Sequence, residues 1–277
     1  MSHKNKNAVR IILFYLLTFG IAMIVVIPFF WMVSTSLKSK GAIMQIPIEW
    51  IPQDPTLDSY KTVFTRFPLV QAIINSFGIT ITYTVVTILS ASMAAFAITK
   101  IKFAYADIIF KLFLASMMIP TQVTLIPLFV IMNKLGLINT YPSVILPSLF
   151  RAFAVFLLVQ QMRGIPNDFM EAAKIDGAGM FRIYAIVIMP LTKSAIATLT
   201  ITTFMECWND YLWPLLMLSD KTKMTLTLAL NSLNGQYGTE YNLLMAGSLI
   251  SMLPIMCIYA FAQKYFKAGL MSGGVKG

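Results

Sequence analysis

Long uninterrupted apolar runs divide the chain into segments that are too hydrophobic for a water-soluble fold. Residues 11–32, 67–99, 112–132 and 241–263 carry no charged side chain. A helix needs roughly 20 apolar residues to cross a hydrocarbon core about 30 Å thick. Each run is therefore predicted to be a transmembrane helix.

Two further apolar blocks are interrupted by charge. Arg151 interrupts residues 141–161, and Glu206 and Asp210 interrupt residues 194–218. We count both as spans because lipid tolerates spanning backbone only as helices or closed barrels. The long apolar runs exclude a barrel, whose strands alternate in short segments. The prediction is a single-domain (1–277), all-α polytopic membrane protein with six transmembrane helices. The approximate spans are residues 11–34, 70–98, 107–133, 141–162, 194–218 and 242–263.

Composition and charge agree with this class and add an orientation. Only 12% of the residues are charged, which is about half the share in an ordinary soluble domain. Six spans place both termini on one side, and the tails and loops of that side hold most of the lysine and arginine. The positive-inside rule predicts that both termini are cytoplasmic. The formal net charge of +10 is then explained by topology, and nucleic-acid binding is not expected.

A polar insert separates the fourth and fifth spans. Residues 171–190 read EAAKIDGAGMFRIYAIVIMP and lie in the longest predicted cytoplasmic loop. Asn167 can cap a helix whose first turn carries Asp168 and Glu171, acids that suit the positive end of a helix dipole. Gly177 can then adopt the left-handed conformation that ends this helix.

A second helix is expected from about Met180 into the fifth span, with Pro190 at its entry. The small side chains of Ala172 and Ala173 allow another protein to approach the first helix closely. From these residues alone, two interpretations stay open. The insert is either a short ridge that docks into a partner's groove or a solvated loop helix without a partner.

The spacing of the insert resembles the EAA loop of bacterial ABC importer permeases, written EAA-x3-G-x9-I-x-L-P. Glu171, Ala172 and Ala173 supply the first element, Gly177 the glycine, and residues 187–190 the end, with Val187 and Met189 replacing isoleucine and leucine. Other stretches resemble the carbohydrate-type permeases related to the maltose permease subunit MalG. These stretches are residues 119–141, 208–218 and 265–277.

This resemblance covers nearly the whole chain and implies a type I ABC importer permease fold. The EAA loop (163–190) would be the coupling helix that sits in a cleft of a cytoplasmic ATPase. Glu171 would pair there with a basic residue, and Gly177 would supply the turn. ATPase closure would alternate access to a central cavity.

The resemblance also implies the assembly and its location. The chain would be a non-catalytic subunit in the bacterial cytoplasmic membrane, paired with a second homologous permease. Two ABC ATPase subunits would bind ATP and magnesium, and an extracellular or periplasmic sugar-binding protein would deliver the carbohydrate. The chain itself contains no G-x-x-x-x-G-K-[ST] phosphate loop, so no cofactor is expected on it.

Ionisable groups inside the membrane are costly and are candidates for function. Glu206, Asn209, Asp210 and Trp213 follow helical spacing, which predicts that they share one face. The functional interpretation is a sugar-binding surface on which Trp208, Tyr211 or Trp213 stacks. Two alternatives stay open: hydrogen bonds to the partner permease, or a structural pair with Arg151.

A second polar cluster, Thr121, Gln122 and Thr124, follows Pro120 in the third span, and a structural role is favoured for it. The alternative function from another class is an ion-gradient-driven secondary transporter with Glu206, Asp210 and Arg151 as its relay. A membrane-embedded enzyme ranks below both because no nucleophile accompanies the acids. His3 is the only histidine, so no histidine-based metal site is proposed.

Overall fold

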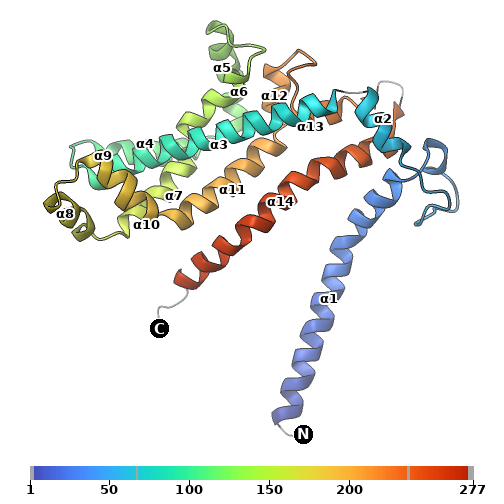
Figure 1. Ribbon diagram of the computed structural model, residues 1–277, viewed down its shortest axis with the longest axis horizontal. Helices are drawn as coiled ribbons and strands as arrows, with labels where there is room; N and C mark the ends of the chain where they lie inside the picture. Colours follow the sequence, from blue (N-terminus) through green and yellow to red (C-terminus); the bar gives the residue numbers. More distant parts are fainter. Residues whose placement is uncertain (1–2, 67, 236–237, 274–277) are drawn as a thin grey trace. The chain divides into compact units, whose positions relative to one another are not determined.

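The structure is a computed structural model that describes residues 3–66, 68–235 and 238–273. These residues are almost entirely helical (Figure 1), as the apolar runs predict. They fall into two compact units. The first comprises residues 1–69 and 230–253, and the second comprises residues 70–229 and 254–277.

The first unit begins with α1 (His3–Ser36), in which the segment Arg10–Ser36 is apolar and has none of its spanning window buried. A helix that is hydrophobic on all sides needs lipid or another chain around it. The remaining elements are η1 (Lys40–Ala42), α2 (Asp58–Arg66) and a hairpin of β1 (Asn234–Gly235) and β2 (Gly238–Thr239), paired antiparallel. The start of α14 (Tyr241–Gly273) completes the unit.

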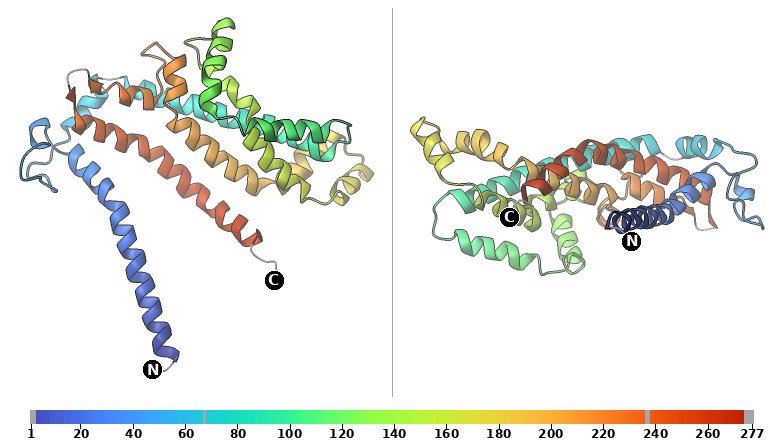
Figure 2. Two further views of the ribbon diagram at one scale, coloured as in Figure 1. Left: turned by 180° about the vertical axis from the view of Figure 1, so that it is seen from behind. Right: turned by 90° about the horizontal axis from the view of Figure 1, so that it is seen from below.

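The second unit is built on α3 (Leu69–Lys100), α7 (Ala152–Arg163) and α11 (Lys193–Asn209). Its core joins Ala95 of α3, Leu158 of α7 and Leu199 of α11, each at most 1% exposed. The helices α4 (Ala106–Ser116) and α11 both pack against α7 (Figure 2). This bundle therefore supplies the rigid frame on which the shorter elements are placed.

The shorter elements of the second unit lie at the ends of these helices or connect them. They are α5 (Thr121–Lys134), α6 (Tyr141–Ile145), the 3-10 helix η2 (Leu146–Phe150), α8 (Asp168–Ile175), α9 (Met180–Arg182), the π-helix η3 (Ile183–Ile188), α10 (Met189–Leu191), α12 (Leu212–Met217) and α13 (Leu226–Asn231).

Among the described residues, four helical segments are long and apolar enough to cross a membrane. They are Arg10–Ser36, Leu69–Lys100, Tyr141–Arg163 and Tyr241–Ala260. Two bent pairs raise the number to as many as six if each pair is one span. One pair joins α4 to α5 at 105°, and the other joins Met180–Leu191 to α11 at 79°. The number of six predicted spans equals this upper count, but the second pair starts at Met180 and ends at Asn209, whereas the fifth span was expected over residues 194–218.

The bends correct three helices that were expected to be continuous. The span expected over residues 107–133 breaks before Pro120, which has no backbone N–H to continue the helical ladder. The helix expected from Met180 into the fifth span ends at Leu191. The fifth span, expected over residues 194–218, is helical only to Asn209, because Asp210 is extended and α12 is a separate short helix.

Candidate functional site

A cavity of about 450 Å³, lined by both polar and apolar side chains, opens in the second unit. Segments that lie far apart in the sequence supply its wall: α3, α5, the junction of η2 with α7, the end of α11, and α12. Leucine, valine and proline side chains cover part of the wall. Its polar and aromatic residues are Tyr83, Thr121, Gln122, Thr124, Arg151, Glu206, Cys207, Asp210 and Trp213.

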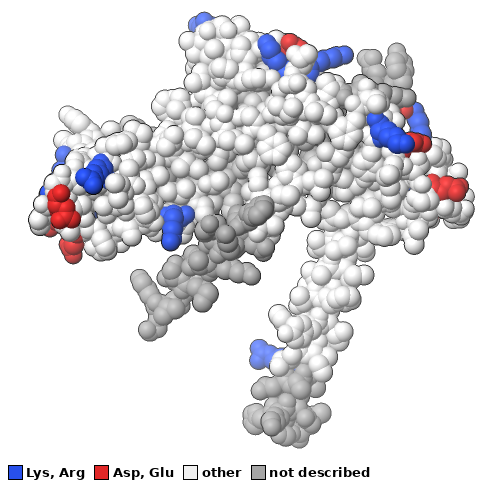
Figure 3. Space-filling view, viewed as in Figure 1, with Lys and Arg blue, Asp and Glu red and all other residues white. Residues whose placement is uncertain are grey.

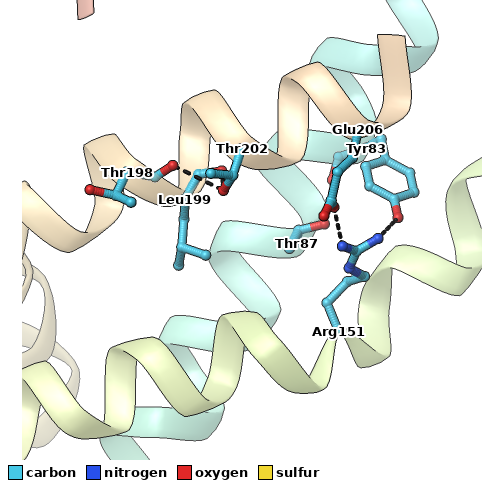
Figure 4. A network of polar contacts seen from close by, with 7 residues as sticks. All are labelled: Tyr83, Thr87, Arg151, Thr198, Leu199, Thr202 and Glu206. Atoms are coloured by element: carbon cyan, nitrogen blue, oxygen red, sulfur yellow. Dashed lines mark hydrogen bonds and ion pairs between the residues drawn. The ribbon is translucent and has the colours of Figure 1, made fainter. Parts of the chain in front are cut away.

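Among the described residues, Arg151 is the only lysine or arginine on this wall. It lies in the extended link between η2 and α7, with ψ near 97°, so its side chain leaves the helix axis. Its Nη1 donates a hydrogen bond to the Tyr83 hydroxyl (2.7 Å), and its Nη2 forms an ion pair with the Glu206 carboxylate (Figure 4). The structural pair between Arg151 and Glu206, one of the alternatives left open by the sequence, is present.

Asp210 and Trp213 reach the same cavity through a helix break. The Asp210 carboxylate accepts the Trp213 backbone N–H at 3.4 Å, which is the length of a weak cap at the start of α12. The Trp213 indole Nε1–H donates to the backbone oxygen of Ser143 (3.1 Å) in the interior. The prediction that Glu206, Asp210 and Trp213 share one helical face is therefore wrong in geometry, although all three line one cavity.

Two of the residues proposed for the substrate pathway do not line the cavity. Trp208 is 1% exposed and lies between Phe77, at 4.9 Å edge-on, and Phe204, stacked at 5.6 Å. The exposed Asn209 donates through its side-chain amide to the Met205 backbone oxygen (2.9 Å). Trp208 is therefore held among aromatic rings of α3 and α11, and neither residue is part of the cavity wall.

The cavity also includes a cluster that sequence reasoning interpreted as structural. Thr121, Gln122 and Thr124 lie at the start of α5 and line the cavity, and the other polar residues of the wall are distant from them in the sequence. The side-chain nitrogen of Gln122 makes no hydrogen bond within the part of the chain that the structure describes. Polar side chains at membrane depth directly after Pro120 were the available signal for this location.

The second candidate site is a docking ridge, defined as residues 168–178, formed by α8 and its terminal turn. Gly177 has φ +77° and ends the helix as predicted. The Ala178 N–H bonds the Ala173 oxygen (2.9 Å), and the Gly177 N–H bonds the Lys174 oxygen (3.0 Å), the two bonds of a Schellman motif. A β-branched side chain at this φ would be strongly disfavoured.

The start of the ridge differs from the expectation. Asn167 occupies the N-cap position, but its side chain makes no capping bond. Its Oδ1 instead accepts a hydrogen bond from Lys100 Nζ (3.1 Å), which also donates to the Ile165 backbone oxygen (2.6 Å). The end of α3 is therefore tied directly to the segment that leads into the ridge.

One side of the ridge is anchored and the other is exposed. Met170 is 4% exposed and belongs to the core of the second unit, whereas Glu171 and Ala172 are exposed and Ile175 is 87% exposed. Charges of both signs gather at this end of the unit, and most of the bundle surface on that face is uncharged (Figure 3). The ridge thus presents small, apolar and acidic groups together.

The segment after the ridge is also fixed to the bundle. Ile183 and Ile188 of the π-helix η3 are fully buried, and the Tyr184 hydroxyl shares a 2.7 Å hydrogen bond with Ser92 Oγ of α3. Pro190 is exposed within the short α10, and the chain turns at Thr192 into α11. The segment after the ridge is therefore joined to α3 and α11 by buried contacts.

No group of three or more metal-ligating side chains that could hold an ion occurs among the described residues.

A sequence profile described as "binding-protein-dependent transport system inner membrane component" matches residues 86–271. The chain is 37% identical to the arabinooligosaccharides transport system permease protein AraQ of Halalkalibacterium halodurans, over 98% of this chain and 100% of that protein. It is 33% identical to the protein of the same name from Bacillus subtilis, over the whole of both chains.

A solved structure confirms the expected fold. The crystal structure of a bacterial ABC transporter involved in the import of the acidic polysaccharide alginate contains a chain that superposes with a TM-score of 0.83. The match covers 96% of this chain and 99% of that chain at 24% sequence identity. The fold of this chain is therefore the fold of a subunit in that transporter.

Proposed function

Because this chain belongs to the family of binding-protein-dependent transport system inner membrane components, we propose that it imports a sugar or oligosaccharide as the permease subunit of an ATP-driven transporter. Its relatives named for arabinooligosaccharide transport, which match it over their full length, support the substrate class. The chain is multi-pass in the cytoplasmic membrane, and both of its termini lie on the cytoplasmic side in this proposal.

The observation that carries the proposal is the mechanical link between the exposed ridge and the buried bundle. Glu171 and its exposed neighbours offer a surface to an ATPase, while Met170, Ile183 and Ile188 are locked into the core. Packed cores switch between discrete arrangements and do not deform continuously, so a displaced ridge moves the attached helices as a body. Two of the helices that hold the ridge, α3 and α11, also contribute Tyr83, Glu206 and Cys207 to the wall of the cavity, and Arg151 on that wall directly precedes α7.

The chain thereby forms part of the transport pathway and transmits the motion of the ATPases, and it carries out no chemistry of its own. Two ATPase subunits hydrolyse ATP with magnesium, a second homologous permease closes the other half of the pathway, and a sugar-binding protein supplies the cargo. Closing the ATPases draws the two ridges together, and the pair of permeases then exchanges access from one side of the membrane to the other.

The assembly is tested by extracting the tagged chain from its own membrane in mild detergent and identifying the proteins that co-purify. A second permease and an ATPase with a phosphate loop are expected. The contradicting result is a chain that is recovered alone and still supports gradient-driven uptake in vesicles. In that case Glu206, Asp210 and Arg151 become the relay of a secondary transporter.

The role of the ridge is tested separately by Glu171→Lys. We expect normal membrane insertion but loss of the ATPase from the purified complex, because an exposed acid that pairs with a basic groove is converted to a like charge. Asp54→Lys is the matched control, since Asp54 is exposed on a loop of the first unit and lies outside the ridge. Equal recovery of ATPase with both variants would contradict the docking assignment.

A further inference from the structure

We infer that this cavity accepts an uncharged sugar and excludes acidic ones, an inference that rests on the proposed transport function. Relatives alone leave the matter open, because arabinooligosaccharides are neutral and alginate is acidic. The part of the chain that the structure describes places a single cationic side chain, Arg151, on the cavity wall, and that side chain is already paired. The wall therefore offers hydrogen bonds but no free positive charge for a carboxylate, phosphate or sulfonate.

Both ends of the Arg151 guanidinium are occupied. Nη1 donates to the Tyr83 hydroxyl at 2.7 Å, Nη2 pairs with the Glu206 carboxylate, and the Tyr83 ring lies 5.9 Å from the guanidinium carbon. Proteins recognise carboxylates and phosphates mainly through bidentate arginine pairs. A solute anion would have to displace Glu206, and the displaced carboxylate would remain on the same wall and repel the anion.

The formal charges on the wall sum to an excess of one negative charge. Arg151 contributes one positive charge, and Glu206 and Asp210 contribute two negative ones. Asp210 forms no ion pair with lysine or arginine within the described residues, and its carboxylate is held by backbone N–H groups, among them that of Trp213 at 3.4 Å. A negative solute is therefore repelled, and at an effective dielectric of about 20 a charge some 8 Å away is disfavoured by roughly tenfold or more.

The rest of the wall suits neutral hydroxyl groups. The Thr121 and Thr124 hydroxyls and the Gln122 amide supply uncharged donors and acceptors on the side formed by α5. Trp213 and the neighbouring leucine and proline side chains supply apolar surface against which the C–H face of a sugar ring can pack. Binding by this wall depends on hydrogen bonds and apolar contact, so a charge on the solute makes binding less favourable.

The electrical potential of the cavity can be measured without knowing the cargo. In the purified complex, Cys207 and Cys257 are replaced by alanine and a reporter thiol is introduced by Thr124→Cys, at an exposed position on the wall. Its rates of reaction with the cationic trimethylammonium-ethyl methanethiosulfonate and the anionic sulfonatoethyl methanethiosulfonate are each divided by the rate for free cysteine. Gln122→Cys provides a second reporter in case the first variant does not fold.

We expect the normalised cation-to-anion ratio to be roughly ten or more. Asp210→Asn should lower the ratio several-fold, and Arg151→Gln should raise it. Asp54→Asn makes the same chemical change on an exposed loop of the first unit and should leave the ratio unchanged. A ratio of one or less, or a ratio that Asp210→Asn does not alter, overturns the inference.

Two further readouts separate this inference from the transport proposal. A low ratio in a complex that retains its ATPase removes the charge selectivity and leaves the permease assignment in place. A high ratio in a chain that purifies without any ATPase supports the charge selectivity and contradicts the permease assignment. Uptake of trigalacturonate by the reconstituted transporter at a rate equal to that of neutral arabinotriose would also overturn the selectivity.

Discussion

The docking ridge is assembled from residues that are neighbours in the sequence, whereas the cavity wall is assembled from residues that are distant in it. The two Schellman bonds of the ridge span five residues or fewer. In the cavity, Arg151 meets Glu206 across 55 positions and Tyr83 across 68. A local motif keeps its geometry wherever the bundle places it, but a site built from several helices exists only while their packing is intact.

This contrast predicts that substitutions in the ridge change coupling without changing stability, and that substitutions in the cavity change both. The variants that follow test the difference, from the largest expected effect to the smallest.

Gly177→Val should abolish most transport. Valine is strained at φ +77°, by roughly 1–2 kcal/mol, so the turn after α8 must rearrange and the ridge shifts against its partner. We expect normal insertion, an unchanged unfolding temperature of the bundle to within a few degrees, and a fall of at least about tenfold in ATP-driven uptake.

Two matched controls isolate the cause of that loss. Gly136→Val introduces the same strain at φ +68° in the turn after α5, away from the ridge, and should retain coupling. Gly179→Val adds the same bulk next to the ridge at φ −71°, where a built Cβ meets no atom within 4 Å, and should retain most uptake. If all three variants transport equally well, Gly177 is not part of the coupling element.

Arg151→Met should destabilise the second unit because it leaves the Glu206 carboxylate without its cation. Since the two side chains are 30% and 52% exposed, we expect a coupling energy of only about 1 kcal/mol in a double-mutant cycle with Glu206→Gln. Thermal unfolding of the purified complex measures the coupling. The pair Arg163 and Asp107, whose side chains are 46% and 83% exposed, is the control and should give a value near zero, and an equal value for both pairs would contradict a special role for the cavity pair.

Trp213→Phe should have a smaller effect on stability. The substitution removes the indole N–H that bonds the backbone oxygen of the fully buried Ser143, and an unsatisfied buried carbonyl costs about 1 kcal/mol. The expected drop in unfolding temperature is about 2–4 °C. Trp50→Phe, at a position 52% exposed, should produce no measurable drop. The same drop in both variants would mean that aromatic bulk matters and the hydrogen bond does not.

The smallest effect concerns pH and the loop next to the cavity. Hydrogen bonds from the Thr222 backbone N–H (2.9 Å) and hydroxyl (2.8 Å) lower the pKa of Asp220 below its ordinary value. A carboxyl whose pKa is lower in the folded state stabilises the fold above its unfolded pKa, near 3.9, and this contribution is lost as pH falls through the lower folded value.

Asp220→Asn should therefore flatten the fall in unfolding temperature below about pH 4 while changing little at neutral pH. Asp54→Asn, on an exposed loop of the first unit, is the control and should keep the slope of the parent chain. An identical slope for the parent and the Asp220 variant would show that the turn at Thr222 does not depend on the charge.

Several features of the sites could be predicted from residues that act over short distances. Gly177 was expected to be left-handed because a helix with Glu171 in its first turn must end before the next apolar segment, and the structure agrees. The capping bond of Asn167 was wrong because Lys100, from a distant helix, supplies a charged donor for the same oxygen. Even at the ridge, a tertiary contact overrode the local preference.

The cavity was only partly predictable for the same reason. The spacing of Glu206, Asn209, Asp210 and Trp213 assumes an unbroken helix, but α11 ends at Asn209, and Trp213 reaches the cavity from the separate helix α12 while Asn209 does not line it. Trp208 resembled a sugar-stacking residue by type, yet Phe77 of α3 and Phe204 enclose it. Whether an aromatic side chain faces a cavity or a neighbouring ring depends on the other helices, which its own sequence neighbourhood does not specify.

The sequence by itself determined the membrane class, the helical composition, the family and the location of the ridge. Long apolar runs are stable as helices in lipid, and a motif of fixed spacing depends only on local backbone geometry. The tertiary structure alone decided where the long helices bend and which charges meet in the cavity. Those outcomes depend on packing among α3, α5, α7, α11 and α12, where buried polar groups must find partners across the bundle. Arg151 could be recognised as costly from the sequence, but only the folded chain shows that Glu206 has already neutralised it.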